Sequence, residues 1–137
     1  MNLAFFDTNI LLCGEDASAL DKQKLASALF ADHLRRNTAV LSVQVLQEYY
    51  ATVTRKLNTP LERAQRRVEI LASAKVIRFE IRDLVAAIEL HRLRQISFWD
   101  ALIVHAARIS GATLLYSEDL QHKSVLGGVR IVNPFIN

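Results

Sequence analysis

The chain has 137 residues, 51% of them apolar and 23% charged, so it is long enough to bury a core and is expected to form one domain over residues 1–137. Its single cysteine, Cys13, excludes an internal disulfide framework and is typical of a reducing cytoplasm. No apolar run reaches the roughly 18 residues that cross a bilayer, and Asp7 interrupts any secretory leader. We therefore expect a cytoplasmic protein with no membrane segment.

The net charge of +3 is unevenly distributed along the chain. Residues 55–94 carry ten basic and five acidic side chains, whereas the rest of the chain carries seven basic and nine acidic ones. A basic middle of this kind is consistent with contacts to a phosphate backbone beside an acidic metal site. It is equally consistent with a solvated helix face of mixed charge, so composition leaves both interpretations open.

Short β-rich runs alternate with longer segments of helical periodicity. In chain order, strands are expected at residues 3–6, 39–43, 76–79, 113–116 and 129–132. Strands that are separated by helices need crossover connections, which favour a parallel sheet covered by helices. We therefore predict an α/β fold, namely a three-layer α/β/α sandwich whose mostly parallel central sheet has about five strands.

The helices between these strands are predicted from apolar spacing and from capping residues. The first follows the apolar positions of residues 26–34, and the next has Leu46, Tyr49, Tyr50, Val53 and Leu57 on one face. Residues 59–62 (Thr-Pro-Leu-Glu) predict a capping box with Pro60 at the first helical position. A later helix places Ile81, Leu84, Val85 and Ile88 on one side, and a last, nearly all-apolar helix runs from Ser97 to a stop at Gly111.

Four acidic side chains lie where the predicted sheet would bring them together. Asp7 directly follows the first strand, Asp119 follows the fourth, and Glu48 is early in the helix after the second. Asp100 is in the first turn of the helix that begins at Ser97. Ligands of open parallel sheets bind beyond the carboxyl ends of the strands, where helices also begin. The four carboxylates are therefore expected to meet at one edge of the sheet.

Carboxylates that close together repel one another unless a cation neutralises them. Oxygen ligands without histidine or cysteine spacing favour a hard ion, Mg²⁺ or Mn²⁺, and such ions suit phosphoryl chemistry. Asn9 and Ser117 are candidates to orient the acids or to hold water beside the ion. Each acid also has a purely structural interpretation: Asp7 as a helix cap, Glu48 facing solvent, Asp100 pairing with a Ser97 cap, and Asp119 in an ordinary loop.

Four segments together resemble the PIN-domain ribonuclease family, and most closely the toxins of VapBC toxin–antitoxin pairs. They are residues 7–9 (Asp-Thr-Asn), Glu48, residues 98–103 (Phe-Trp-Asp-Ala-Leu-Ile) and residues 115–120 (Leu-Tyr-Ser-Glu-Asp-Leu). The resemblance covers essentially the whole chain, including its closing strand at residues 129–134.

The resemblance implies roles for individual residues. Asp7, Glu48, Asp100 and Asp119 correspond to the metal-binding acidic quartet of the family, and Ser117 to its auxiliary position. Glu118 adjoins Asp119, so either can supply the metal-facing oxygen, and we favour Asp119.

The family's activity is endonucleolytic cleavage of RNA that depends on Mg²⁺ or Mn²⁺. Its toxins are usually dimers, and a small antitoxin covers their active site. Two other functions stay open: an RNA-processing nuclease without an antitoxin, and a non-catalytic module that uses the acids only to bind a regulatory ion.

The remaining chemistry-bearing residues are predicted to be structural. The four histidines show no ligand spacing, and Tyr49, Tyr50 and Tyr116 follow apolar patterns typical of a core. Phe98 and Trp99 could offer a face to an unstacked base, but a buried helix start is the favoured explanation.

Overall fold

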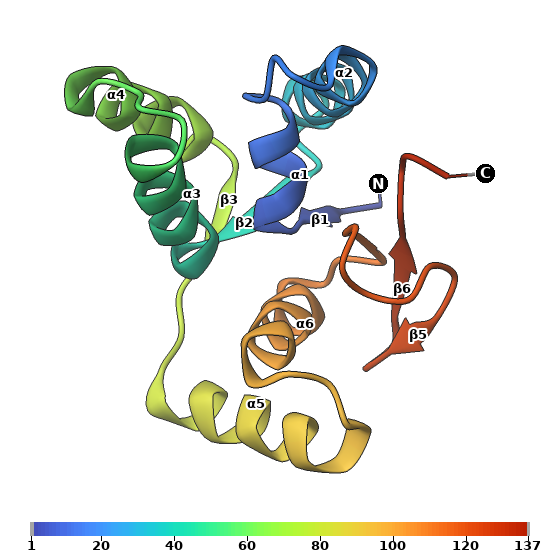
Figure 1. Ribbon diagram of the computed structural model, residues 1–137. Coiled ribbons are helices and arrows are strands. Elements are labelled where there is room, and N and C mark those ends of the chain that lie inside the picture. The colour runs from blue at the N-terminus through green and yellow to red at the C-terminus, as the bar shows by residue number, and fades with distance from the viewer. Residues whose placement is uncertain (1, 137) are drawn as a thin grey trace.

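The computed structural model describes residues 2–136. Its fold is a six-stranded sheet with helices on both sides (Figure 1). The strand order is β3-β2-β1-β4-β6-β5. The strands are β1 (Ala4–Phe6), β2 (Ala39–Ser42), β3 (Lys75–Ile77), β4 (Leu114–Tyr116), β5 (Val125–Leu126) and β6 (Val129–Val132). All neighbouring strands pair in parallel except β5, which is antiparallel to β6. The predicted α/β architecture is confirmed, with one more strand than expected because β5 has only two residues.

Within residues 2–136, six helices surround the sheet. They are α1 (Thr8–Cys13), α2 (Leu20–Arg35), α3 (Val43–Arg55), α4 (Leu61–Leu71), α5 (Ile81–Arg94) and α6 (Phe98–Ser110). In Figure 1, α1 to α4 lie above the strands, and α5 and α6 pack together below them. No helix among residues 2–136 combines the length and the apolar character needed to cross a membrane.

The position of β1 determines where a ligand can bind. β1 is fully buried and lies between β2 and β4, the two strands that the chain reaches on opposite sides of it. The Asp7 amide donates a 3.0 Å hydrogen bond to the Tyr116 carbonyl, so β1 and β4 end side by side. In open α/β sheets the strand ends at such a reversal of order leave a crevice. Both predicted acidic loops, after β1 and after β4, are therefore at this crevice.

Two details of the helices differ from the sequence prediction. Pro60 is the residue before α4 and not its first residue, and no side chain caps that helix. A reciprocal capping box instead begins α5, where the Glu80 amide donates to Asp83 Oδ2 at 2.9 Å. α6 begins as predicted, with Ser97 Oγ accepting from the Asp100 amide at 3.0 Å, and it ends at Gly111 with φ +83°.

Two apolar helix faces that the sequence pattern predicts are partly exposed in the structure. Tyr50 on α3 lies at the surface, as does Leu57 just beyond the end of that helix, although Tyr49 and Val53 of α3 are buried. On α5, Ile81 and Val85 are 76% and 56% exposed. The reason is that α5 packs on α6 through another side, which buries Ala87 and Leu90. Apolar spacing correctly predicted these helices but not which apolar side chains face the core.

Candidate active site

Asp7 is positioned by the strand that precedes it and the helix that follows it. As the N-cap of α1, it accepts the Thr8 amide on Oδ1 at 2.7 Å. Its other oxygen, Oδ2, accepts the Ser117 hydroxyl at 2.8 Å and the Asn9 side-chain amide at 3.2 Å. The side chain is only 6% exposed. The cap interpretation of Asp7 is thus correct, and the cap uses one oxygen while the second points to the residues after β4.

The loop after β4 is tied to Asp7 through Ser117 and Asn9. Ser117 is fully buried, and its Oγ also accepts the Asp119 amide at 3.2 Å. The Asn9 Nδ2 group donates to Asp119 Oδ2 at 2.9 Å as well as to Asp7. The Glu118 amide donates to Asn9 Oδ1 at 3.2 Å, which fixes the orientation of that carboxamide. The side-chain NH2 group of Asn9 therefore binds the carboxylates of Asp7 and Asp119 together.

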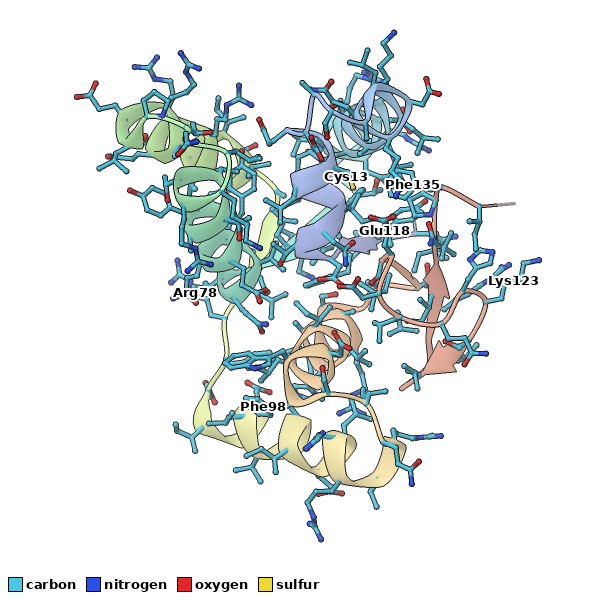
Figure 2. All side chains as sticks on the ribbon, viewed as in Figure 1. Cys13, Arg78, Phe98, Glu118, Lys123 and Phe135 are labelled. Atoms are coloured by element: carbon cyan, nitrogen blue, oxygen red, sulfur yellow. The ribbon has the colours of Figure 1, made fainter. Side chains whose placement is uncertain are left out.

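Glu118 and Asp119 point to different places. Glu118 accepts the Cys13 thiol at 3.3 Å and pairs with Lys22, and Figure 2 shows Glu118 and Cys13 beside α1. Asp119 lines the same hollow as Asp7. Burial, followed by the hydrogen bond to Glu118, raises the pKa of Cys13 to about 11, so the thiol stays protonated and keeps donating. The geometry favours Asp119 as the acid of this pair that faces a ligand.

Glu48 reaches the same place from α3. The Thr8 hydroxyl donates to Glu48 Oε1 at 2.9 Å, and the Gln44 side-chain amide approaches the same oxygen at 3.4 Å. Glu48 is therefore turned toward α1 and is not simply directed into solvent. The sequence analysis assigns no part to Thr8 or Gln44, because their contacts with Glu48 arise only when α1 packs against α3.

Asp100 is part of α6, which lies on the other side of the sheet from α1 and α3 (Figure 1). α6 follows α5 and not a strand, so the rule that placed Asp7 and Glu48 does not apply to it. α6 leads into β4, and a helix that returns to the start of a parallel strand begins at the carboxyl edge of the sheet. The Asp100 amide donates to Ser97 Oγ. Within residues 2–136, the Asp100 carboxylate accepts no hydrogen bond. Capping therefore explains the role of the Asp100 amide but not that of its carboxylate.

The four acids line one hollow of about 330 Å³, which we call the carboxylate cleft. Its lining residues are Asp7, Thr8, Asn9, Leu12, Gln44, Glu48, Thr52, Trp99, Asp100, Ile103 and Asp119. Three helices, the N-cap residue of α1 and the loop after β4 contribute these side chains. The lining includes no histidine: His33 and His105, for example, are buried elsewhere, against Tyr116 and Asp83 respectively.

The electrostatics of the cleft are dominated by Asp7. Burial raises the pKa of Asp7 to about 6, opposed by the hydrogen bonds from Ser117 and Thr8. The charges of Asp119 and Asp100 raise it further. Deprotonation of Asp7 at neutral pH is therefore costly, and a bound cation would lower that cost.

Comparison with known proteins identifies the family. The family model described as "PIN domain" matches residues 4–126, which include all four acids. The chain belongs to the PIN domain family. A search of the curated proteins gave no match.

Solved structures share this PIN fold at low sequence identity. A toxin–antitoxin complex from Klebsiella pneumoniae has a TM-score of 0.71 at 18% identity, covering 96% of this chain and 98% of that one. VapC20 from Mycobacterium tuberculosis, a toxin that cleaves the sarcin–ricin loop, has a TM-score of 0.67 at 22% identity, covering 85% and 89%. VapBC2 from Rickettsia felis, bound to a DNA fragment from its promoter, has a TM-score of 0.68 at 21% identity, covering 94% and 96%.

The donors of this PIN domain fit a hard divalent cation. Within residues 2–136, no three His, Cys, Asp or Glu side chains already stand together as a complete ligand set. Mg²⁺ needs no such set, because it keeps several waters and binds through one or two protein carboxylates. Asp7 and Asp119 already converge on one N–H donor group, that of Asn9. A cation that took the place of this N–H group between the two carboxylates would meet oxygen ligands, which is the chemistry Mg²⁺ and Mn²⁺ select.

Proposed function

We propose that this PIN domain is an endoribonuclease that depends on Mg²⁺ or Mn²⁺ and is the toxin of a VapBC-type toxin–antitoxin pair. The observation that carries the proposal is the carboxylate cleft, where Asp7, Glu48, Asp100 and Asp119 face one space from distant parts of the chain. Structural neighbours that are toxins, one of which cleaves RNA, support the choice of substrate. Because its substrate is RNA, we place the protein in the cytoplasm.

Each cleft residue has a proposed part in the reaction. Asp7, Asp100, Asp119 and Glu48 would hold the ion. When bound, the ion supplies activation of a water molecule and stabilises charge on the scissile phosphodiester. Ser117 keeps Oδ2 of Asp7 aimed at the cleft, and Asn9 keeps Asp7 and Asp119 converged. Thr8 and Gln44 orient Glu48.

The first test is cleavage of RNA by the purified protein. Single-stranded and loop RNA should be cut with Mg²⁺ or Mn²⁺, and a chelator should stop the reaction. Asp7→Asn, Asp100→Asn and Asp119→Asn should each abolish cleavage, whereas Glu48→Gln should weaken it, because Glu48 already shares its oxygen with Thr8. Full activity in chelator would exclude a metal mechanism.

The same assay separates the alternative functions. A protein that binds Mg²⁺ but cleaves no RNA under any condition would be a metal-binding regulatory module. A protein that cleaves RNA without affecting growth on expression, and whose gene has no small upstream reading frame for a DNA-binding protein, would be a processing nuclease. Growth arrest that a co-expressed upstream partner relieves is the result expected for a toxin.

We also propose that the protein is a homodimer and that a small antitoxin covers its cleft. The dimer is supported by the exposed apolar side chains of α5, including Ile81 and Val85. The antitoxin is supported by the neighbours from Klebsiella and Rickettsia, whose structures are of toxin–antitoxin assemblies. Light scattering of the purified protein tests the first, with Val85→Glu expected to give a monomer. Inhibition of cleavage by the upstream partner tests the second.

A further inference from the structure

A second hollow lies next to the carboxylate cleft. Its volume is about 310 Å³, and we call it the side pocket. Its lining includes Gln44, Gln47, Ile77, Phe79, Trp99 and Leu102, together with Ser42 and Val43 at the start of α3. Gln44 and Trp99 line the carboxylate cleft as well, so the two hollows share a wall. The two hollows are therefore adjacent to each other.

The chemistry of the side pocket differs from that of the cleft. Within residues 2–136 its lining carries no charged side chain: Ile77, Phe79 and Leu102 are apolar, and Gln44 and Gln47 are neutral carboxamides. A phosphate or a metal ion would find no countercharge there. A nucleobase is flat, uncharged and polar only along its edges, which suits an aromatic wall with carboxamide donors and acceptors.

Trp99 provides the aromatic wall. It is 62% exposed, so the predicted burial of this helix start is wrong for Trp99. Its ring is braced by an edge-on contact with Phe98, with centroids 5.1 Å apart. Phe98, labelled in Figure 2 at the start of α6, in turn contacts the His91 ring on α5. The indole is thus held in place from one side while most of its surface stays open.

We infer that the side pocket binds one unstacked base of the RNA, next to the phosphate held at the carboxylate cleft. The base stacks on Trp99, and the carboxamides of Gln44 and Gln47 hydrogen-bond its edge. Trp99 immediately precedes Asp100 in the chain, so a base stacked there belongs to a nucleotide at the cleavage site. This inference rests on the proposed ribonuclease function for the placement of the phosphate.

The binding test uses the fact that Trp99 is the only tryptophan in the chain. Its fluorescence is followed while short single-stranded oligoribonucleotides are added in chelator, which prevents cleavage. Stacking should give saturable quenching. An abasic oligonucleotide with the same backbone, and an RNA duplex of the same length, should cause little quenching because neither presents an unstacked base.

Variants test the same inference through cleavage. Trp99→Ala should lower kcat/KM roughly 5- to 150-fold, the range for loss of one base–aromatic stack, and Trp99→Phe should recover most of it. Gln47 lines the side pocket but not the cleft, so Gln47→Ala should change base preference while leaving metal binding intact. The control is Val125→Ala, which removes a 61% exposed apolar side chain on β5 at the opposite edge of the sheet and should change neither.

The outcomes separate this inference from the proposed function. If RNA is cleaved but no oligonucleotide quenches Trp99, and both pocket variants keep wild-type kcat/KM and base preference, the inference is wrong and the nuclease stands. If bases quench Trp99 but no RNA is cleaved, the pocket binds bases and the proposed function is wrong. If the variants weaken only the binding of a protein partner, the pocket belongs to that partner and the inference is overturned.

Discussion

Replacing Asp7 with asparagine should destroy activity and make the metal-free protein more stable at neutral pH. The folded pKa of Asp7 is about 6, against 3.8 for the ordinary side chain. Since each pKa unit corresponds to 1.36 kcal/mol, the charged carboxylate costs the folded state about 3 kcal/mol above that pH. Asparagine avoids this cost but loses about 2 kcal/mol, because the NH2 group that replaces Oδ2 cannot accept from Ser117 or from Asn9. The expected net gain is about 1 kcal/mol.

The sign of the pH dependence follows from the raised pKa. A carboxyl group with a raised folded pKa supports the folded state below its unfolded pKa of 3.8, and this support is lost as the pH rises through about 6. The stability of the wild type should therefore fall relative to Asp7→Asn as the pH rises from 4 to 7. Denaturant unfolding in chelator across this range measures the difference directly. Added Mg²⁺ should then stabilise the wild type much more than the variant.

A matched control is Asp32→Asn. Asp32 is exposed and pairs with Arg35 and Arg36, and the Arg36 hydrogen bond lowers its pKa. Its replacement should give no gain in stability at neutral pH. The reasoning is refuted if Asp7→Asn is no more stable than the wild type at about pH 8, or if the difference between them is the same at every pH.

Three further predictions concern the site, the basic surface and the fold. Glu118→Gln should retain most cleavage activity in the RNA assay while Asp119→Asn abolishes it, because only Asp119 lines the cleft; equal losses would contradict this. Arg63 and Arg66 are exposed on α4. If this face contacts RNA, changing both to glutamine should lower the slope of log binding constant against log salt concentration by up to about two phosphate contacts. An unchanged slope would show that this face is solvated surface. Gly111→Ala should lower the free energy of unfolding by about 1 kcal/mol in denaturant titrations, because φ is +83° there; no loss would mean that the backbone relaxes.

The sequence was sufficient to predict the sheet and the positions of Asp7 and Asp119, because both follow directly from where buried strands end. It also placed Asp100 at the same edge, but the physical reason is that α6 returns to β4, a relation between distant elements that the sequence pattern does not show. The choice between Glu118 and Asp119 depended on Cys13, Lys22 and Asn9, which are remote in the chain. The exposure of Trp99 was mispredicted because an apolar helix pattern does not say which side the neighbouring helix covers.

The four acids are separated by up to 112 positions, from Asp7 to Asp119, and they come from both layers of the molecule. No fragment that lacks either layer contains the complete set, and during synthesis the cleft cannot close before the loop after β4 has left the ribosome. The carboxylate cleft is therefore complete only after the segment that carries Asp119 has been made. Under the proposed function, cleavage of RNA would begin only from that point, and an antitoxin that covers the cleft would have to be present by then.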